Sequence, residues 1–543
     1  MKKVKKYLAV ILTLIMIISI IPLSSITASA AASGTCGDSL TWAFDEETGT
    51  LTISGTGEMQ EIYHYSGSRP WDDYHNSIKK VVIEEGVKTI SDYAFYYYNK
   101  ITSITLPDSM TTIGAYAFSW CTSLTDVTIP NGVTKIGNEA FSFCQGITKV
   151  TIGKSVKEIN DVAFIFCNNL ESFEVVSNNQ YYSNDEYGVL FNKDKTTLIQ
   201  YPLGNTGTSY TIPDGVIKIG YRAFFGASLT SVTIPDSVVT ISEMAFLGTG
   251  LTSILIPDSV ITIEKSAFDT CSNLENVTIG KNVATIGTLA FSSCSKLKYV
   301  NIPASVVKID DKAFSWCEAL TGIDVDSDNQ YYSSDEYGVL FNKDKTTLIQ
   351  YPMGNISNSY TIPDSVLIIG NGAFHNSINL ETITIGENVT TICKLAFGSC
   401  NSLTSITIPE SVRTIDCNAF FLCTNLTSVT ISVGVETIGE RAFYGCESLT
   451  DVYYSGTQAQ WNRITIEDNE CLLNADLHLN NCEHTDYDDN GYCDECNEFL
   501  DSMDECDCNC HKSGISKFFF KIILFFQKLF GLNRECACGV VHY

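Results

Sequence analysis

The residues best suited to bind a cation lie in one short acidic stretch near the C-terminal end of the chain. Oxygen donors recur there at alternate positions, in Asp486, Asp488, Asn490, Tyr492 (through its backbone carbonyl) and Asp494. Oxygen ligands with this spacing, and a glycine such as Gly491 at the sixth position, resemble a Ca²⁺ loop. At the twelfth position, Asn497 stands where a bidentate Glu completes such a loop. The stretch is therefore read either as a Ca²⁺ site or as a plain acidic turn.

Cysteine and histidine residues surround this stretch. The tail, residues 481–543, holds the cysteines Cys482, Cys493, Cys496, Cys506, Cys508, Cys510, Cys536 and Cys538, with His484, His511 and His542 near them. Thiolate and imidazole are Zn²⁺ ligands, so zinc is one interpretation. Disulfides are the other, since CxxC in an exported chain is more often oxidised than metal-bound. The tail is a separate, small, Cys-rich module in either case.

A second group of cysteines has a regular spacing. Each lies three residues after a recurring phenylalanine, and the group comprises Cys121, Cys144, Cys167, Cys271, Cys294, Cys317, Cys400, Cys423 and Cys446. If the repeats stack, neighbouring thiols come close but their Cβ vectors run parallel, which opposes disulfide geometry. Ala227 and Ser377 occupy the same position in other repeats. We therefore expect buried free thiols that act as small apolar residues.

Catalytic groupings are not evident. The chain has 7 histidines, and the sequence contains no HExxH, nucleophile elbow or phosphate loop. The formal net charge of -28 opposes binding to nucleic acid. We expect no enzymatic activity and no resident cofactor outside the tail.

The element that must position all these residues is a repeat. One phenylalanine recurs every 22 or 23 residues with two gaps of 60, at Phe95, Phe118, Phe141, Phe164, Phe224, Phe246, Phe268, Phe291, Phe314, Phe374, Phe397, Phe420 and Phe443. A fixed period of this kind is typical of a solenoid, in which each unit contacts only its neighbours.

Residues 124–146 illustrate one of the 13 units. Leu124, Val127 and Ile129 predict a strand with inward apolar positions, which Pro130 ends. A second short strand follows, and then a short helical turn that carries Phe141. Polar residues before this turn are expected to be helix N-caps, as at Ser91, Asn160, Ser242, Asp310 and Asp416. The expected fold is a β-rich solenoid of parallel coils with short helical turns.

The pattern L-x-x-V-x-I-P-x-x-V-x-x-I-G-x-x-A-F-x-x-C, repeated over residues 80–453, resembles the BspA-type leucine-rich repeat of bacterial surface proteins. The resemblance implies a parallel leucine-rich-repeat-like solenoid, export, and adhesion or binding to protein or matrix ligands. It assigns no ligand-binding residue.

The two long gaps contain nearly the same segment, residues 179–202 and 329–352. Apolar runs on both sides of Asn192-Lys193-Asp194-Lys195 predict an inserted hairpin. One interpretation is a duplicated spacer. The other is a binding projection, because insertions on one face of a repeat array often bind. That projection would present Tyr181, Tyr182, Tyr331 and Tyr332.

The ends of the chain differ from the repeats. Residues 1–30 read as a signal peptide, with an N-terminal membrane anchor as the alternative. Residues 34–79 predict an N-terminal β cap, and residues 454–480 a C-terminal cap. Residues 515–531, with lysines on one stripe, predict an amphipathic helix that lies on a membrane surface or packs within its own Cys-rich module.

These features lead to one functional expectation and one alternative. The chain is expected to be a secreted or cell-surface protein that recognises protein or matrix ligands through its solenoid. The alternative is an extracellular structural or scaffold component attached through its tail, by metal, by disulfides, or by contact with a membrane or cell wall. The sequence does not specify the ligand or the oligomeric state.

Overall fold

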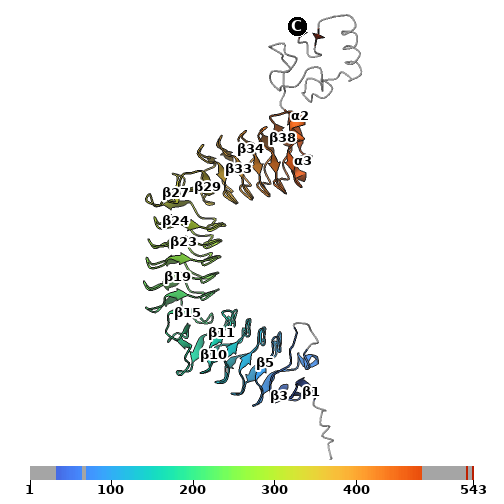
Figure 1. Cartoon of the computed structure of the whole chain (residues 1–543), viewed down its shortest axis with the longest axis vertical. Helices are drawn as coiled ribbons and strands as arrows, with labels where there is room; N and C mark the ends of the chain where they lie inside the picture. Colours follow the sequence, from blue (N-terminus) through green and yellow to red (C-terminus); the bar gives the residue numbers. More distant parts are fainter. Residues whose placement is uncertain (1–31, 64–68, 480–533, 536–540, 543) are drawn as a thin grey trace, which may run out of the picture. The chain divides into compact units, whose positions relative to one another are not determined.

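The computed structural model describes residues 32–63, 69–479, 534–535 and 541–542 (Figure 1). The chain divides into two compact units. The first comprises residues up to 193 together with 202–205, and the second comprises residues 194–201 and those from 206 onward. Each unit is a β-solenoid with little helix.

The first unit begins with an antiparallel sheet of β1 (Ala32–Gly37), β2 (Leu40–Asp45) and β3 (Thr50–Gly55). β3 then pairs in parallel with the first coil. Each coil contributes a longer strand, namely β4 (Lys80–Ile83), β6 (Ser103–Thr105), β8 (Asp126–Thr128), β10 (Lys149–Ile152) and β12 (Ser172–Val175). The shorter strands form a second parallel ladder of β5 (Thr89–Ile90), β7 (Thr112–Ile113), β9 (Lys135–Ile136) and β11 (Glu158–Ile159). The 3-10 helix η1 (Asp72–Tyr74) precedes β4.

The second unit repeats this arrangement. Its longer strands are β16 (Ser209–Thr211), β18 (Ser231–Thr233), β20 (Ser253–Leu255), β22 (Asn276–Thr278), β24 (Tyr299–Ile302), β26 (Gly322–Val325), β30 (Ser359–Thr361), β32 (Thr382–Thr384), β34 (Ser405–Ile408), β36 (Ser428–Ile431), β38 (Asp451–Tyr454) and β40 (Asp476–Leu479). The strands of its second ladders are β15 (Thr197–Gln200), β17 (Lys218–Ile219), β19 (Thr240–Ile241), β21 (Thr262–Ile263), β23 (Thr285–Ile286), β25 (Lys308–Ile309), β29 (Thr347–Gln350), β31 (Ile368–Ile369), β33 (Thr391–Ile392), β35 (Thr414–Ile415), β37 (Thr437–Ile438) and β39 (Thr465–Ile466).

Few other elements occur. Helices α2 (Gln458–Trp461) and α3 (Glu470–Asn474) follow β38, and two short strands near the C-terminus, β41 (Arg534–Glu535) and β42 (Val541–His542), pair antiparallel. Within the described part of the chain, no helix is both long and apolar enough to cross a membrane.

The coil forms because alternate strand residues face a shared interior. In β8 the side chain of Val127 is buried, whereas those of Asp126 and Thr128 are exposed. The next coil is in register, so that Val150 pairs with Val127. Each coil therefore buries its apolar edge against the next coil.

The segment that carries each phenylalanine is not helical, so the prediction of short helical turns is wrong. Alternate N–H groups leave the turn: those of Tyr116 and Phe118 donate to the carbonyls of Asn138 and Ala140 in the next coil, each at 2.8 Å. The N–H of Ser119 instead closes its own turn on Tyr116, at 3.2 Å. A helix would use every N–H internally and leave none to join neighbouring coils.

Because this segment is a run of turns, the polar residues that were expected to be helix N-caps have no helix to cap. The carboxylate of Asp416 accepts the N–H of the next residue at 2.7 Å, and Ser91 donates its hydroxyl to the carbonyl of Gln60 at 2.6 Å. These side chains fix turns and join segments within their own unit.

The phenylalanines stack along the interior of each unit, and we call this column the phenylalanine spine. Ring centroids lie 5.1 Å apart for Phe95 and Phe118, and 5.1 Å apart for Phe268 and Phe291, with nearly parallel planes. All these rings are buried. The spine fills the centre of each coil.

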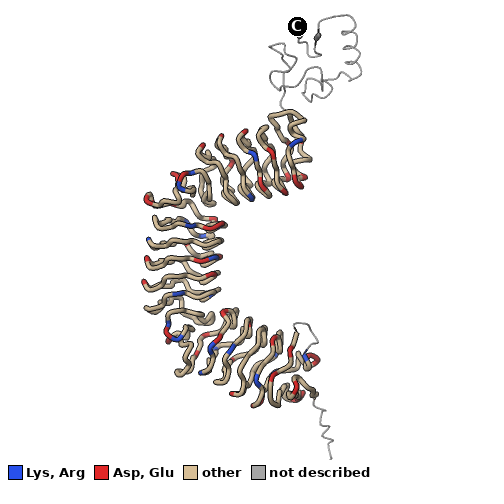
Figure 2. Tube along the Cα trace, in the orientation of Figure 1, with Lys and Arg blue, Asp and Glu red and all other residues tan. Residues whose placement is uncertain are grey.

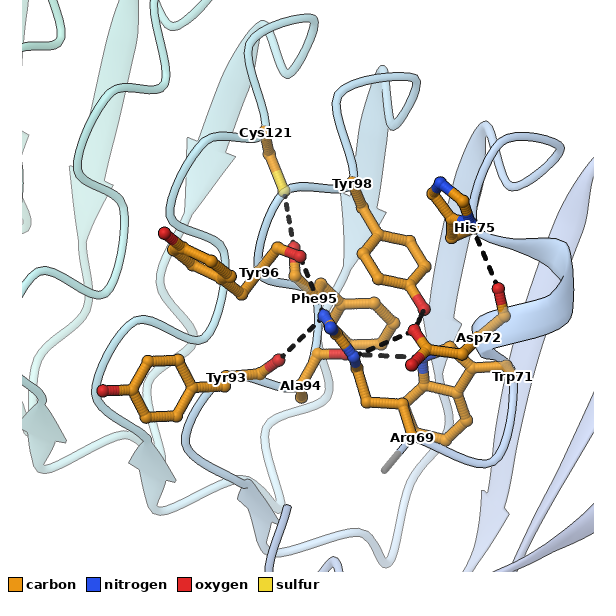
Figure 3. A network of polar contacts seen from close by, with 10 residues as sticks. All are labelled: Arg69, Trp71, Asp72, His75, Tyr93, Ala94, Phe95, Tyr96, Tyr98 and Cys121. Atoms are coloured by element: carbon orange, nitrogen blue, oxygen red, sulfur yellow. Dashed lines mark hydrogen bonds and ion pairs between the residues drawn. The ribbon is translucent and has the colours of Figure 1, made fainter. Parts of the chain in front are cut away.

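The N-terminal end of the spine is closed by residues that imitate a preceding coil (Figure 3). In inner coils, the carbonyls of Ala117 and Ser119 accept N–H groups from the coil before. At the first coil, the indole N–H of Trp71 donates to the equivalent carbonyl of Ala94 at 3.3 Å.

Arg69 supplies the next donor and is held in place by Asp72 (Figure 3). Its guanidinium donates to the carbonyl of Tyr96 at 2.8 Å and lies 3.0 Å from the carboxylate of Asp72. The ring of Trp71 stacks on Phe95 at 5.3 Å, so the cap continues both the hydrogen bonding and the spine.

At the C-terminal end of the solenoid, residues again take the place of a missing coil, but here they accept N–H groups instead of donating them. The last spine residue, Phe443, donates its N–H to the side-chain oxygen of buried Asn469 at 3.0 Å. The N–H of Arg441 donates to the carbonyl of Asp468 at 3.1 Å. Asp468 and Asn469 therefore replace the carbonyls of a following coil.

Substitution of Trp71 tests the cap. We expect Trp71→Ala to lower the free energy of unfolding of the first coils by about 3–5 kcal/mol, because it removes a buried ring. Trp71→Phe keeps the stacking on Phe95 and loses one hydrogen bond, so it should cost about 1 kcal/mol. Amide hydrogen exchange in β4 and β6 measures both effects. Equal exchange in the two variants would contradict the role of the ring.

Candidate functional site

The predicted metal ligands Asp486, Asp488, Asn490, Tyr492 and Asp494 lie outside the described residues. So do all eight cysteines of the tail, the segment 515–531, and the signal segment 1–30. Among the residues that the structure does describe, no group of three His, Cys, Asp or Glu side chains is arranged to hold a metal ion.

The cysteine column lies inside the solenoid as free, buried thiols, in agreement with the packing role predicted from the spacing. Each sulfur also makes a polar contact. The Sγ of Cys144 donates to the carbonyl of Phe118 in the preceding coil at 3.1 Å, and Cys400 does the same to Phe374 at 3.1 Å. The thiol is small enough for the core and still satisfies a spine carbonyl.

Burial raises the pKa of three of these thiols, Cys167, Cys317 and Cys400, to about 12, well above the ordinary value for a cysteine. The thiolate is the reactive form of cysteine, so these groups are inert at neutral pH. These three thiols are therefore part of the scaffold.

The raised pKa values predict a loss of stability at high pH. Unfolded thiols lose their protons above pH 9, whereas folded ones keep them to about pH 12. Each of these three thiols should therefore lower the free energy of unfolding by about 1.4 kcal/mol per pH unit within this window. Chemical denaturation at several pH values measures the slope, which Cys400→Ser should reduce by one thiol's share. A slope that is unchanged in this variant would contradict the assignment.

The segments 179–202 and 329–352 form hairpins that merge with the coils. In the second copy, β27 (Tyr332–Ser334) pairs antiparallel with β28 (Leu340–Asn342), and β28 with β29. β29 then pairs in parallel with β31. In the first copy, β13 (Tyr182–Asn184) pairs in the same way with β14 (Leu190–Asn192).

The stretch around each hairpin holds one more coil than the phenylalanine count implies. Tyr351 takes the spine position: its ring stacks on Phe374 at 5.2 Å, and its N–H donates to the carbonyl of Ala373 at 2.7 Å. Tyr201 stacks on Phe224 at 5.5 Å in the same manner. A count of phenylalanines misses these coils because tyrosine takes the spine position in them.

A buried asparagine sets the start of each hairpin. The side-chain amide of Asn329 donates to the carbonyls of Pro303 and Val306, at 2.8 and 3.0 Å. Its side-chain oxygen accepts the N–H groups of Tyr331 and Tyr332, both at 2.8 Å. Asn179 makes the equivalent four bonds in the first copy.

The predicted display of four tyrosines is correct for two of them. Tyr182 and Tyr332 are half-buried, and their hydroxyls accept the N–H groups of Ile159 and Ile309, at 3.0 and 2.8 Å. They occupy the open ends of the ladders that finish at β11 and β25, where the next coil would otherwise pair. Tyr181 and Tyr331 point into solvent, 49% and 52% exposed.

Asn329 is a direct test of how the hairpin is positioned. Asn329→Asp removes the two amide donors and buries a carboxylate, so we expect a loss of about 2–4 kcal/mol of stability. The exposed residue Asp328 offers a matched control, since Asp328→Asn introduces the residue that Asn178 already provides in the first copy and should change stability by less than about 0.5 kcal/mol. Denaturation and hydrogen exchange of residues 329–350 measure both. Equal effects of the two variants would contradict the role of Asn329.

A surface that the sequence reasoning missed lies on the first unit. Two residues after each spine phenylalanine, an aromatic ring stacks on its neighbour in the next coil. We call this row the aromatic ladder, and it comprises Tyr97, Trp120, Phe143 and Phe166. Trp120 and Phe143 are 4.2 Å apart with planes at 9°. The signal was present, because these residues recur at 23-residue intervals.

The ladder residues occupy strained backbone positions. Their φ angles are 70°, 64°, 56° and 60°, in the left-handed region that favours glycine. The equivalent positions in the second unit hold Gly226, Gly248, Thr270, Ser293, Trp316, Asn376, Ser399, Leu422 and Gly445, also with positive φ. The turn therefore forms without aromatic side chains, and the fold does not require the ladder.

Tyrosine hydroxyls and carboxylates border the ladder. Tyr93 stacks on Tyr116 at 4.9 Å, and the hydroxyl of Tyr116 donates to Glu139 at 3.1 Å. Burial and the nearby carboxylates of Asp92 and Glu139 raise the pKa of Tyr93. This surface offers apolar edges, hydroxyl groups and negative charge together.

Positions of Lys and Arg are interspersed with positions of Asp and Glu along the coils (Figure 2). Several of these residues form ion pairs between adjacent coils, such as Lys281 with Asp258 at 2.6 Å and Lys298 with Glu275 at 2.7 Å. These pairs are solvent-exposed and contribute little to stability.

His375 is the one histidine within the repeats. Burial lowers its pKa, and its ring packs against Trp316 at 4.8 Å. This environment supports a packing role.

A protein-family model described as a BspA type leucine rich repeat region matches the chain in six copies. The matched residues are 73–188, 204–321 and 353–471. A comparison with curated proteins found no match.

Solved structures of bacterial proteins are similar to the chain. A leucine-rich repeat protein from Eubacterium ventriosum shares 25% identity over 72% of this chain and 95% of its own, with a TM-score of 0.44. A leucine rich cell surface protein from Faecalibacterium prausnitzii shares 26% identity over 80% and 97%, with a TM-score of 0.36. The pneumococcal vaccine antigen PcpA shares 18% identity over 83% and 98%, with a TM-score of 0.41.

Proposed function

Because the chain belongs to the BspA-type leucine-rich repeat family, we propose that it binds protein or matrix ligands through outward side chains of its coils. The pattern of residues 1–30 supports export, and the proposal places the protein at the cell surface or in the surrounding medium. The inward residues, the spine and the two caps form a scaffold whose outward positions can vary without loss of the fold.

The aromatic ladder carries this proposal. A non-glycine residue in the left-handed region costs about 1–2 kcal/mol. Ring stacking returns about 0.5–1.5 kcal/mol per pair, so the ladder yields little net stability. Since the second unit forms the same turn with glycine and serine, a contact role accounts for the aromatic residues of the first unit.

The composition of this surface favours a protein ligand. Tyrosine and tryptophan are enriched in protein-binding surfaces, because they offer large, rigid contact areas at low entropic cost. Tyr97 is 51% exposed and stacks on Trp120, and Tyr93 and Tyr116 border them. The acidic neighbours Asp92 and Glu139 suit a partner with basic side chains.

The ladder can be removed without disturbing the turn. Trp120→Ser and Phe143→Ser introduce a residue that Ser293 and Ser399 already carry at the same position, with φ of 56° and 58°. We expect the double variant of the mature full-length protein to keep its circular dichroism and to lose at least about 10-fold in apparent affinity for a coated basement-membrane protein extract. Surface plasmon resonance measures the affinity.

The control is Trp316→Ser in the second unit, which removes a 46% exposed aromatic residue from the same turn position. It should bind as the wild type does. Absence of wild-type binding would contradict the proposed function. Equal binding by the ladder variant and the wild type would show that the ladder is not the contact surface.

A further inference from the structure

The two hairpin segments have stayed nearly identical while the rest of the chain diverged. Residues 179–202 and 329–352 differ at one position, where Asn184 corresponds to Ser334. Exposed residues outside the hairpins differ at the same 150-residue offset, as in the pairs Asp126 and Asn276, Lys149 and Tyr299, Lys157 and Val307, and Lys218 and Ile368. Several surface positions outside the hairpins have thus changed, whereas only one position has changed within them.

Some exposed hairpin residues are explained by local contacts. The side-chain amide of Gln330 donates to the carbonyl of Asp328 at 2.8 Å, and Lys343 reaches the carbonyl of Ser327 at 3.3 Å. The carboxylate of Asp344 accepts the hydroxyl of Thr346 at 2.8 Å. The same three side chains make the same kinds of contact in the first copy.

Two pairs of exposed residues lack this explanation. In the described part of the chain, the side chains of Tyr181 and Tyr331 make no recorded hydrogen bond, and neither do those of Glu186 and Glu336. Each keeps its identity in both copies without a packing or turn-forming role. Retention of a solvent-exposed tyrosine and glutamate therefore points to contact with another molecule.

We propose that the hairpins are two equivalent binding sites for one basic protein surface, so that the chain is bivalent. Tyr331 precedes β27 and Glu336 lies in the turn that follows it, so these two exposed residues flank the strand. Side chains on both sides of a strand suit contact with a protein surface. The tyrosine provides the apolar contact, and the glutamate pairs with a lysine or arginine of the partner.

This inference rests on the proposed function, because it names further contacts to the same class of ligand. Two linked sites raise apparent affinity on a dense surface, since the second contact becomes intramolecular. On a sparse surface only one hairpin engages, and the gain disappears. The dependence on ligand density is therefore the signature of bivalency, and a merely structural role would not produce it.

The experiment uses the mature full-length protein and a laminin- and collagen-containing basement-membrane extract, coated at one dense and one sparse level. Tyr181→Ser and Tyr331→Ser should each weaken binding to the dense coat by about 10-fold or more, to equal extents. On the sparse coat, each single variant should lose no more than about twofold, and the double variant should lose substantially more on both coats.

The control variant is Tyr299→Ser, which removes a tyrosine that is 49% exposed on β24, matching Tyr181. Its binding should equal that of the wild type on both coats. Circular dichroism and thermal melting confirm that all variants fold.

The outcomes separate the two claims. If the wild type does not bind the extract, the proposed function fails, and bivalency fails with it. If the wild type binds, and the Trp120→Ser and Phe143→Ser variant loses binding while the double hairpin variant does not, the hairpin inference alone is overturned. Unequal effects of Tyr181→Ser and Tyr331→Ser, or effects independent of coat density, also overturn equivalence and bivalency.

Discussion

The structure depends on how the turn beside each spine phenylalanine shares its N–H groups. The N–H of Phe118 donates to the neighbouring coil, and the N–H of the following residue, Ser119, closes the turn. This alternation joins the coils along a third line besides the two parallel ladders. In most turns it also places two residues that are four apart, such as Tyr116 and Trp120, in the left-handed region, since a helical path would turn all N–H groups inward. The spine rings can stack at about 5 Å because the turns are held at the spacing of paired strands.

This division of N–H groups between a turn and the next coil explains how the ends of the solenoid are closed. A terminal coil has carbonyl or N–H groups without a neighbour, and buried groups of this kind are costly. Trp71 and Arg69 supply donors at the first coil, and Asn469 supplies an acceptor at the last. Tyr182 and Tyr332 do the same for the shorter ladders at the hairpins, where each hydroxyl accepts a strand N–H. Caps and hairpins are therefore variants of one solution to one hydrogen-bonding problem.

The same division of N–H groups separates scaffold from surface. Inward positions are restricted by stacking and by the thiol contact to the spine carbonyl, as in Cys400 and Phe374. The left-handed positions face outward, where glycine is sufficient and any larger side chain is an addition to the fold. Aromatic residues at Tyr97, Trp120, Phe143 and Phe166 are such an addition. The exposed tyrosines and glutamates of the two hairpins are another, and both sets are accessible to a partner on a scaffold that does not depend on them.

The sequence by itself determined the features that repeat. The 22- or 23-residue period predicted the solenoid, the buried Val127 and Ile129, and the free thiols, because periodic burial appears directly as periodic residue type. It could also have revealed the aromatic ladder, whose members recur at the same interval. Only the tertiary structure decided what depends on contact between coils. The turn at Phe141 became left-handed instead of helical, Tyr351 entered the spine, and Tyr332 turned inward while Tyr331 stayed in solvent. Adjacent tyrosines look alike in sequence. Their roles differ because only one of them reaches the N–H of Ile309 at the end of its ladder.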